Sequence, residues 1–198
     1  MAGVEERLRR VRDRIAHAAE RAGRDPASVT LIGASKGVDV ARLRDAVIAG
    51  MRDFGENWIQ EAGPKIAAVG PGPRWHLIGH LQRNKVRPAV AVFAVIQTID
   101  SPRLAEAVDR AAGRLGRQMP VLIEVNVAGE ATKYGCAPDD VERLLRAISG
   151  CRYLAPIGLM TVGPLVEDPE VIRPVFRQLR VARDRLRAGV GGEAFREL

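Results

Sequence analysis

Residues 29–40 read VTLIGASKGVDV, and this stretch distinguishes between two α/β architectures. Val29–Ala34 is a short apolar run of the kind that forms a buried strand, and Asp39 is a suitable N-cap for a following helix. A doubly wound open sheet favours a glycine-rich phosphate loop after its first strand, G-x-G-x-x-G or G-x-x-x-x-G-K, and this stretch matches neither. The polar pair Ser35 and Lys36 stands at the end of the strand instead, which favours a (β/α)8 barrel.

The same strand and helix unit repeats along the rest of the chain. Apolar runs bounded by Gly, Asp, Asn or Pro predict buried strands at Val29–Ala34, Met51–Phe54, Trp75–Ile78, Val92–Ile99, Val121–Val127 and Leu154–Met160. Stretches of helical period predict helices at residues 3–23, Val40–Ala49, Trp58–Ala68, Asn84–Val90, Pro102–Leu115, Pro138–Ile148 and Glu170–Leu186. Strand starts lie about 20 to 30 residues apart, which leaves room for one crossover helix each and predicts parallel strands. We therefore predict an α/β fold, a (β/α)8 TIM-type barrel, with six βα units in this chain.

The length and composition of the chain predict one domain that spans residues 1–198. No run approaches the roughly 18 to 20 apolar residues that cross a bilayer, and the predicted helix at residues 3–23 lacks the uniform apolar centre of a secretory signal. We therefore predict a cytoplasmic protein with no membrane partner. Cys136 and Cys151 have no His or Cys neighbours at metal-ligand spacing, so we expect reduced thiols and no metal site.

The net charge of +7 raises the question of a nucleic-acid partner. The arginines are spread out and stand beside acids on helical stretches such as EERLRRVRDR, which is typical of a solvated helix face with ion pairs. Aromatic residues make up only 4% of the chain and leave few platforms for base stacking. A nucleic-acid-binding protein thus ranks last among our hypotheses, and we predict no such partner.

Isolated polar residues end nearly every predicted strand, and a barrel gathers such ends on the face where its sites lie. They are Ser35-Lys36, Glu56-Asn57, His80, Asp100-Ser101, Asn126 and Met160-Thr161. Asn, Asp or Ser at a strand end is more often a cap for the next helix, but a cap does not explain Lys36 or His80.

Lys36 is one of only four lysines, with Lys65, Lys85 and Lys133. It leaves a buried strand among small residues, where little water reaches the amine and the neutral, nucleophilic form is favoured. Such an amine suits a Schiff base with pyridoxal phosphate or with a carbonyl substrate, although the spacing is equally compatible with a lysine that reaches solvent. His80 can act as an acid or base, and Asn57 can hydrogen-bond a ring substituent.

The segments ASKGVDV, RDFGENWIQE, WHLIGHLQRNK, EVNVAGEATKYG and GLMTV together resemble the pyridoxal phosphate homeostasis protein family. The resemblance runs from about residue 5 to residue 190. It implies a barrel similar to the N-terminal domain of alanine racemase, with pyridoxal 5′-phosphate (PLP) held as a Schiff base. By position, Lys36 matches the cofactor lysine and Asn57 the FGEN asparagine near the ring. The resemblance places three more strand-end residues along the pocket, His80, Asn126 and Met160.

The resemblance also implies a non-catalytic role, in which the protein carries or buffers PLP, supports vitamin B6 and amino-acid homeostasis, and passes cofactor to PLP-dependent apoenzymes as a monomer or homodimer. The alternative is a PLP-dependent enzyme of the racemase or decarboxylase type, with His80 as its proton carrier, but the sequence offers no second base. In the family, two further strands with SMGMS-like and RIG-like motifs hold the phosphate. We expect these beyond Leu198, so that this chain is either part of a longer one or a shortened, weaker binder.

Overall fold

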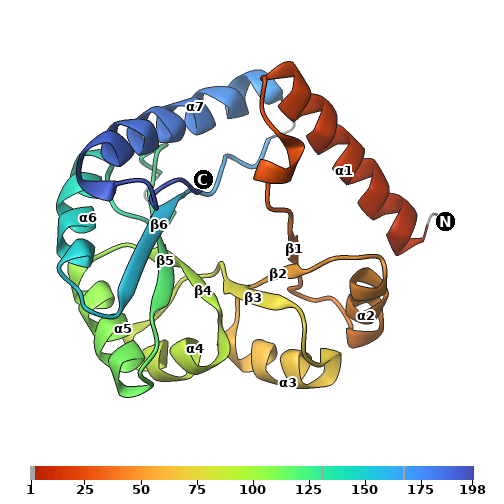
Figure 1. The fold of residues 1–198 in the computed structure, drawn as a ribbon, viewed down its shortest axis with the longest axis horizontal. Helices are drawn as coiled ribbons and strands as arrows, with labels where there is room; N and C mark the ends of the chain where they lie inside the picture. The colour runs from red at the N-terminus through yellow and green to blue at the C-terminus, as the bar shows by residue number, and fades with distance from the viewer. Residues whose placement is uncertain (1–2, 131, 167) are drawn as a thin grey trace. The chain divides into compact units, whose positions relative to one another are not determined.

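The computed structural model describes residues 3–130, 132–166 and 168–198, and the chain forms two compact units (Figure 1). Unit 1 is Met1–His76 and unit 2 is Leu77–Leu198. Along the chain, strands alternate with helices, and the strands follow one another in the sheet in sequence order from β1 to β6. Within the described ranges, no helix is both long enough and apolar enough to cross a membrane.

Unit 1 is built on two parallel strands, in which Ile32 lies opposite Asp53. Its elements are α1 (Val4–Arg21), β1 (Ile32–Ala34), α2 (Val40–Ile48), β2 (Asp53–Glu56) and α3 (Ile59–Val69), and β3 (Arg74–Leu77) lies at the unit boundary. Asp39 caps α2 as predicted, because its side chain accepts a hydrogen bond from the backbone N–H of Arg42 (2.9 Å). Phe54 and Trp75 are buried and stack with 5.2 Å between their ring centroids.

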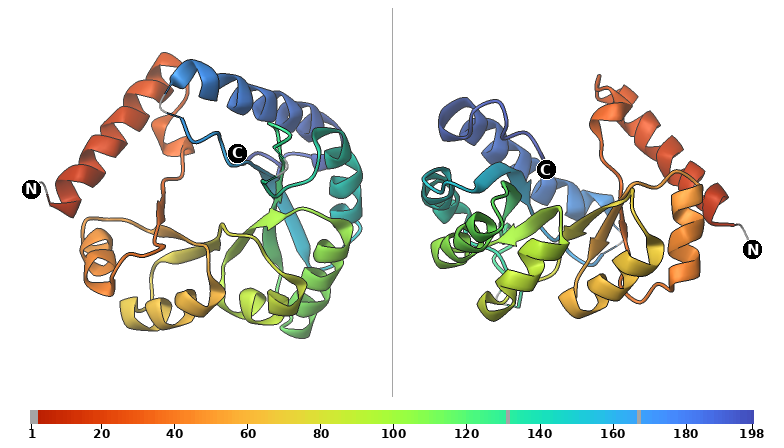
Figure 2. Two further views of the ribbon diagram at one scale, coloured as in Figure 1. Left: turned by 180° about the vertical axis from the view of Figure 1, so that it is seen from behind. Right: turned by 60° about the horizontal axis from the view of Figure 1, so that its bottom comes forward.

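Unit 2 is built on three parallel strands covered by helices. Its elements are α4 (Val86–Val92), β4 (Val95–Ile99), α5 (Pro102–Arg114), β5 (Met119–Glu124), α6 (Val141–Ser149), β6 (Leu154–Met160) and α7 (Pro169–Leu186). Helices α5 and α6 lie side by side in both views of Figure 2, and both contact β6. Their apolar faces supply much of the core of this unit, including Val108, Leu145 and Ile148, which have no exposed surface.

The predicted α/β order of helices and strands is confirmed, and the differences lie at the ends of elements. Strand β1 begins at Ile32 rather than Val29, because residues 26–28 form a 3-10 turn whose C-cap is Val29. The run Val92–Ile99 was predicted as one strand, but Val92 is the last residue of α4 and β4 begins at Val95. A continuous apolar run carries no period that separates a buried helix end from a buried strand.

The C-terminal residues pair with β6 in parallel within unit 2, and Glu197 lies opposite Gly158. The backbone N–H of Glu197 donates to the carbonyl of Ile157 (2.8 Å), and the N–H of Leu159 donates to the carbonyl of Glu197 (3.2 Å). Phe195, just before this pairing, is fully buried. Gly158 permits the close approach, because a Cβ built on it would lie 2.1 Å from the carbonyl oxygen of Glu197.

We predict that Gly158→Ala destabilises the protein by about 1–3 kcal/mol, the usual cost of overpacking, because the added methyl group meets backbone rather than a flexible side chain. The measurement is urea unfolding followed by circular dichroism. Gly63→Ala is the control: apart from its chain neighbours, its Cβ meets nothing within 4 Å. The usual gain from replacing a helical glycine is offset because the following Pro64 crowds the new Cβ, so the stability should change by less than about 1 kcal/mol. Equal stability of the Gly158→Ala variant and the unmodified chain would contradict the close approach.

Candidate functional site

Lys36 lies in a turn directly after β1, and its position depends on Ser35. The buried Ser35 is tied to β2, because both its backbone N–H (2.8 Å) and its hydroxyl (3.0 Å) donate to the carbonyl of Gly55. The turn is closed by the N–H of Val38, which donates to the carbonyl of Ser35 (3.0 Å), and Gly37 adopts φ +69°, which favours glycine.

Lys36 is exposed, so the prediction that little water reaches its amine is wrong. The reason is the turn, which begins after Ser35 and carries the next side chain out of the strand. The amine forms no hydrogen bond or ion pair with any residue that the structure describes. It is therefore accessible to a ligand from solvent.

Asn57 directly follows β2 and is half-buried. Its backbone N–H donates to Glu56 Oε2 (3.0 Å), and the Glu56 side chain has no exposed surface. Lys36 and Asn57 thus follow the ends of neighbouring parallel strands within unit 1, as the sequence predicted.

Lys65 of α3 reaches the same strand ends, which the sequence did not predict. Its Nζ donates to Glu56 Oε1 (2.5 Å), to the backbone carbonyl of Ser35 (2.8 Å) and to Glu61 Oε2 (3.2 Å). Burial lowers the pKa of Lys65, but the hydrogen bonds and charges of Glu56 and Glu61 outweigh it and hold the pKa above its ordinary value. The i,i+4 spacing of Glu61 and Lys65 was the only sequence signal for these contacts of Lys65, and such a spacing predicts an ordinary surface ion pair.

In unit 2, His80 lies beyond the end of β3 and stacks on Tyr134, with 3.8 Å between ring centroids and an interplanar angle of 12°. Its Nδ1 is 3.8 Å from Asp100 Oδ2, just after β4. The sequence predicted His80 and Asp100 as strand-end residues but not Tyr134, because an aromatic residue in a glycine-containing loop has no periodic neighbours that indicate its contact.

Asn126 follows β5 and organises the loop that carries Tyr134. Its Nδ2 donates to the carbonyls of Glu130 (2.8 Å) and Lys133 (3.3 Å), while its buried Oδ1 has no partner among the described residues. The ammonium of Lys133 binds Glu130 Oε1 (2.7 Å). Met160 is the last residue of β6 and is half-buried.

Glu124, the last residue of β5, is a buried carboxyl group that forms no ion pair with the residues that the structure describes. It is 5% exposed, and its Oε2 has no hydrogen-bond partner within the described part of the chain. Burial, together with the charge of Asp100, raises the pKa of Glu124 to about 7. The group is therefore protonated in much of the folded protein near neutral pH.

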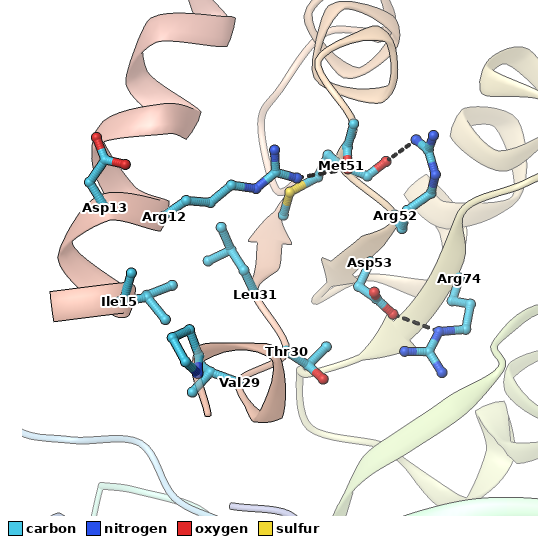
Figure 3. A pocket seen from close by; sticks show the side chains of 13 residues that line it. Arg12, Asp13, Ile15, Val29, Thr30, Leu31, Met51, Arg52, Asp53 and Arg74 are labelled. Carbon is cyan, nitrogen blue, oxygen red and sulfur yellow. Dashed lines mark hydrogen bonds and ion pairs between the residues drawn. The ribbon is translucent and has the colours of Figure 1, made fainter. Parts of the chain in front are cut away.

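A pocket of about 510 Å³ opens in unit 1 at the opposite, N-terminal ends of the strands (Figure 3). Its arginines have structural partners: Arg12 donates to the carbonyl of Gly50 (2.8 Å) after α2, and Arg74 donates to Asp53 Oδ1 (2.7 Å). The buried His76 lies 3.0 Å from the same carboxylate oxygen of Asp53. None of the predicted site residues lines this pocket, and Arg12, Asp53 and Arg74 join elements of unit 1.

Comparisons with known proteins identify the family. A model described as "Alanine racemase, N-terminal domain" matches residues 7–194. The pyridoxal phosphate homeostasis protein of Aquifex aeolicus is 40% identical over 182 residues, which cover 91% of this chain and 80% of the relative. That of Pseudomonas aeruginosa is 38% identical and covers 91% and 79%, respectively. The chain belongs to the pyridoxal phosphate homeostasis protein family.

Solved structures agree with this family and with its fold. PipY of Synechococcus elongatus, described with PLP bound, has a TM-score of 0.84 and 34% identity, and the match covers 98% of this chain and 87% of PipY. A protein from Bifidobacterium adolescentis has a TM-score of 0.91 and 37% identity, and the match covers 98% of this chain and 84% of that protein. Alanine racemase of Clostridium difficile has a TM-score of 0.67 at 15% identity over 82% and 42% of the two chains, which shows the fold alone. The predicted α/β fold of the alanine racemase N-terminal domain type is thus confirmed.

We predict that Glu124 makes the protein less stable as the pH rises from about 4.5 to about 7. In this window the folded state keeps the Glu124 proton while the unfolded chain, with its ordinary pKa, has released it, so raising the pH favours unfolding. Glu124→Gln keeps the shape of the side chain but removes its titration. Across this pH window, the free energy of unfolding of Glu124→Gln should rise relative to that of the unmodified chain by on the order of 2 kcal/mol. Urea unfolding at a series of pH values measures the difference.

Asp100→Asn is the matched control for the pH effect. It removes the charge of Asp100, which helps to raise the pKa of Glu124, but leaves Glu124 buried. The fall in stability with rising pH should therefore become smaller without disappearing. A pH-independent difference between Glu124→Gln and the unmodified chain would contradict the assignment.

Proposed function

We propose that the protein is a non-catalytic PLP-binding protein that holds the cofactor as a Schiff base on Lys36. In this role it carries or buffers PLP and supports vitamin B6 and amino-acid homeostasis. The observation that carries the proposal is the exposed amine of Lys36 just after β1, which has no partner among the residues that the structure describes. Its support comes from the family, in which the PipY structure is described with PLP bound.

The chemistry of the residues present fits the cofactor. Bound PLP supplies an aldehyde carbon, and a Schiff base forms when a neutral amine attacks that carbon and water leaves. Lys36 offers an exposed amine with no partner among the described residues, whereas the ammonium of Lys65 is held by three acceptors and that of Lys133 by Glu130. Lys36 is therefore the lysine that we propose for the cofactor.

The remaining predicted residues have proposed roles that suit their local contacts. Asn57, with its backbone fixed by Glu56, offers a side-chain amide to a substituent of the cofactor ring. His80 and Tyr134 form a flat stacked pair, and the unpartnered Oδ1 of Asn126 is an acceptor for a polar group. Met160 contributes a polarizable apolar surface at the end of β6.

A carrier role suits these contacts better than catalysis does. Racemisation and decarboxylation need a group that exchanges protons with the substrate. His80, the proton carrier in the alternative hypothesis, is engaged by the ring of Tyr134 and lies beside Asp100. The relatives are also named for PLP homeostasis rather than for a reaction. We propose PLP-dependent apoenzymes in the cytoplasm as the recipients of the cofactor.

We predict that PLP added to the protein gives a visible Schiff-base absorbance band, and that borohydride reduction fixes the cofactor on Lys36. Lys36→Ala should abolish both the band and the label, because the attacking amine is gone. Lys85→Ala, a control that removes another lysine, should retain them. Spectrophotometry measures the band, and peptide mass spectrometry locates the label. A band that persists in Lys36→Ala would contradict the proposed Schiff base on Lys36.

The non-catalytic part of the proposal has its own measurement. Incubation of the loaded protein with amino acids should give no racemisation or decarboxylation above the rate of the same concentration of free PLP. Chiral chromatography and carbon dioxide release follow the two reactions. Turnover well above that of free cofactor would favour the enzyme alternative, and His80→Ala would then test the proton carrier.

A further inference from the structure

We propose that Lys65 is a positioning residue, which with Glu56 fixes the backbone on the N-terminal side of both Lys36 and Asn57. The proposal rests on the proposed function, because it concerns how the cofactor lysine is held. It concerns a residue that neither touches the cofactor in our proposal nor forms the Schiff base.

The ammonium of Lys65 is saturated by its contacts. A lysine ammonium has three N–H donors, and here three acceptors lie within hydrogen-bond distance: Glu56 Oε1 (2.5 Å), the carbonyl of Ser35 (2.8 Å) and Glu61 Oε2 (3.2 Å). The Lys65 side chain is only 12% exposed, and Glu56 has no exposed side-chain surface. The Lys65–Glu56 pair is therefore a buried, charge-assisted contact, which is stronger than a surface ion pair.

The pair connects to both proposed site residues through the backbone. The carbonyl that Lys65 binds belongs to Ser35, whose peptide bond joins it to Lys36. The same carbonyl accepts the N–H of Val38, which closes the turn that carries Lys36. On the other side, Glu56 Oε2 accepts the backbone N–H of Asn57 (3.0 Å). One ammonium thus holds the start of the Lys36 turn and the carboxylate that orients Asn57.

The two lysines of unit 1 have different surroundings. The raised pKa of Lys65 keeps it protonated at neutral pH, so it has no lone pair with which to attack an aldehyde. Lys36 is exposed and has no partner among the described residues. The contacts therefore hold the ammonium of Lys65 in place and leave the amine of Lys36 open to a ligand.

The experiment compares Lys65→Met, Lys65→Arg and Glu56→Gln with Glu61→Gln, a control that removes only the exposed partner of Lys65. PLP affinity is measured by titration of the absorbance band. Lys65→Met should weaken binding about tenfold, the worth of one charge-assisted hydrogen bond, and Lys65→Arg should recover most of that loss. Glu56→Gln should weaken binding severalfold, and Glu61→Gln should stay within about twofold.

A pH titration of the Schiff-base band separates positioning from general loss of structure. Lys65→Met leaves the Glu56 carboxylate without its cation. The unpaired negative charge favours the protonated Schiff base, so the midpoint pH of its titration should rise. Glu56→Gln leaves the Lys65 cation unbalanced and moves the midpoint down. A general loosening of the fold would not shift the midpoint pH in opposite directions in Lys65→Met and Glu56→Gln. Should Lys65→Met fail to fold, the PLP affinities of Glu56→Gln and Glu61→Gln still test the proposal, because only Glu56→Gln should weaken binding severalfold.

Two outcomes overturn different statements. If the unmodified protein is not labelled on Lys36 by borohydride, the proposed function fails. If it is labelled there, but Lys65→Met and Glu56→Gln bind PLP like the unmodified chain with the same titration midpoint, the positioning role of Lys65 is wrong and the proposed function stands.

Discussion

The site in unit 1 depends on the compensation of one buried charge, the carboxylate of Glu56 at the end of β2. A carboxylate removed from water is costly unless a cation and hydrogen-bond donors surround it. Lys65 supplies the cation, and the N–H of Asn57 supplies a donor to the second oxygen. Because the same ammonium also binds the carbonyl of Ser35, satisfying this charge joins β1, β2 and α3.

Unit 2 handles a buried carboxyl group in the opposite way. Glu124 also ends a strand, but it forms no ion pair with any residue that the structure describes, and the like charge of Asp100 acts on it in addition to burial. Burial and the charge of Asp100 raise its pKa to about 7, so a bound proton takes the place of a paired cation. A buried glutamate at a strand end is thus paired with a lysine of the next helix in unit 1, whereas in unit 2 its pKa is raised.

The sequence predicted the elements well because each is decided by neighbouring residues. The cap at Asp39 and the apolar periods of the helices are local signals, and the structure confirms them. The stacking of Tyr134 on His80 and the reach of Lys65 to Glu56 join residues far apart in sequence or on separate elements, and no period encodes them. The burial expected for Lys36 was wrong for the same reason, because the direction of one side chain depends on where a turn begins.

The exposure of Lys36 strengthens the case for a carrier more than burial would have done. A lysine enclosed at the base of a pocket is shielded from other molecules, as suits a cofactor that stays through many turnovers. A lysine on a turn at the surface of its unit is reachable by a cofactor that must arrive and depart. The turn is nevertheless held firmly, since Ser35 makes two hydrogen bonds to Gly55 and one to Lys65. In the proposed function, an accessible amine on a fixed backbone would combine release of the cofactor with a defined geometry for its capture.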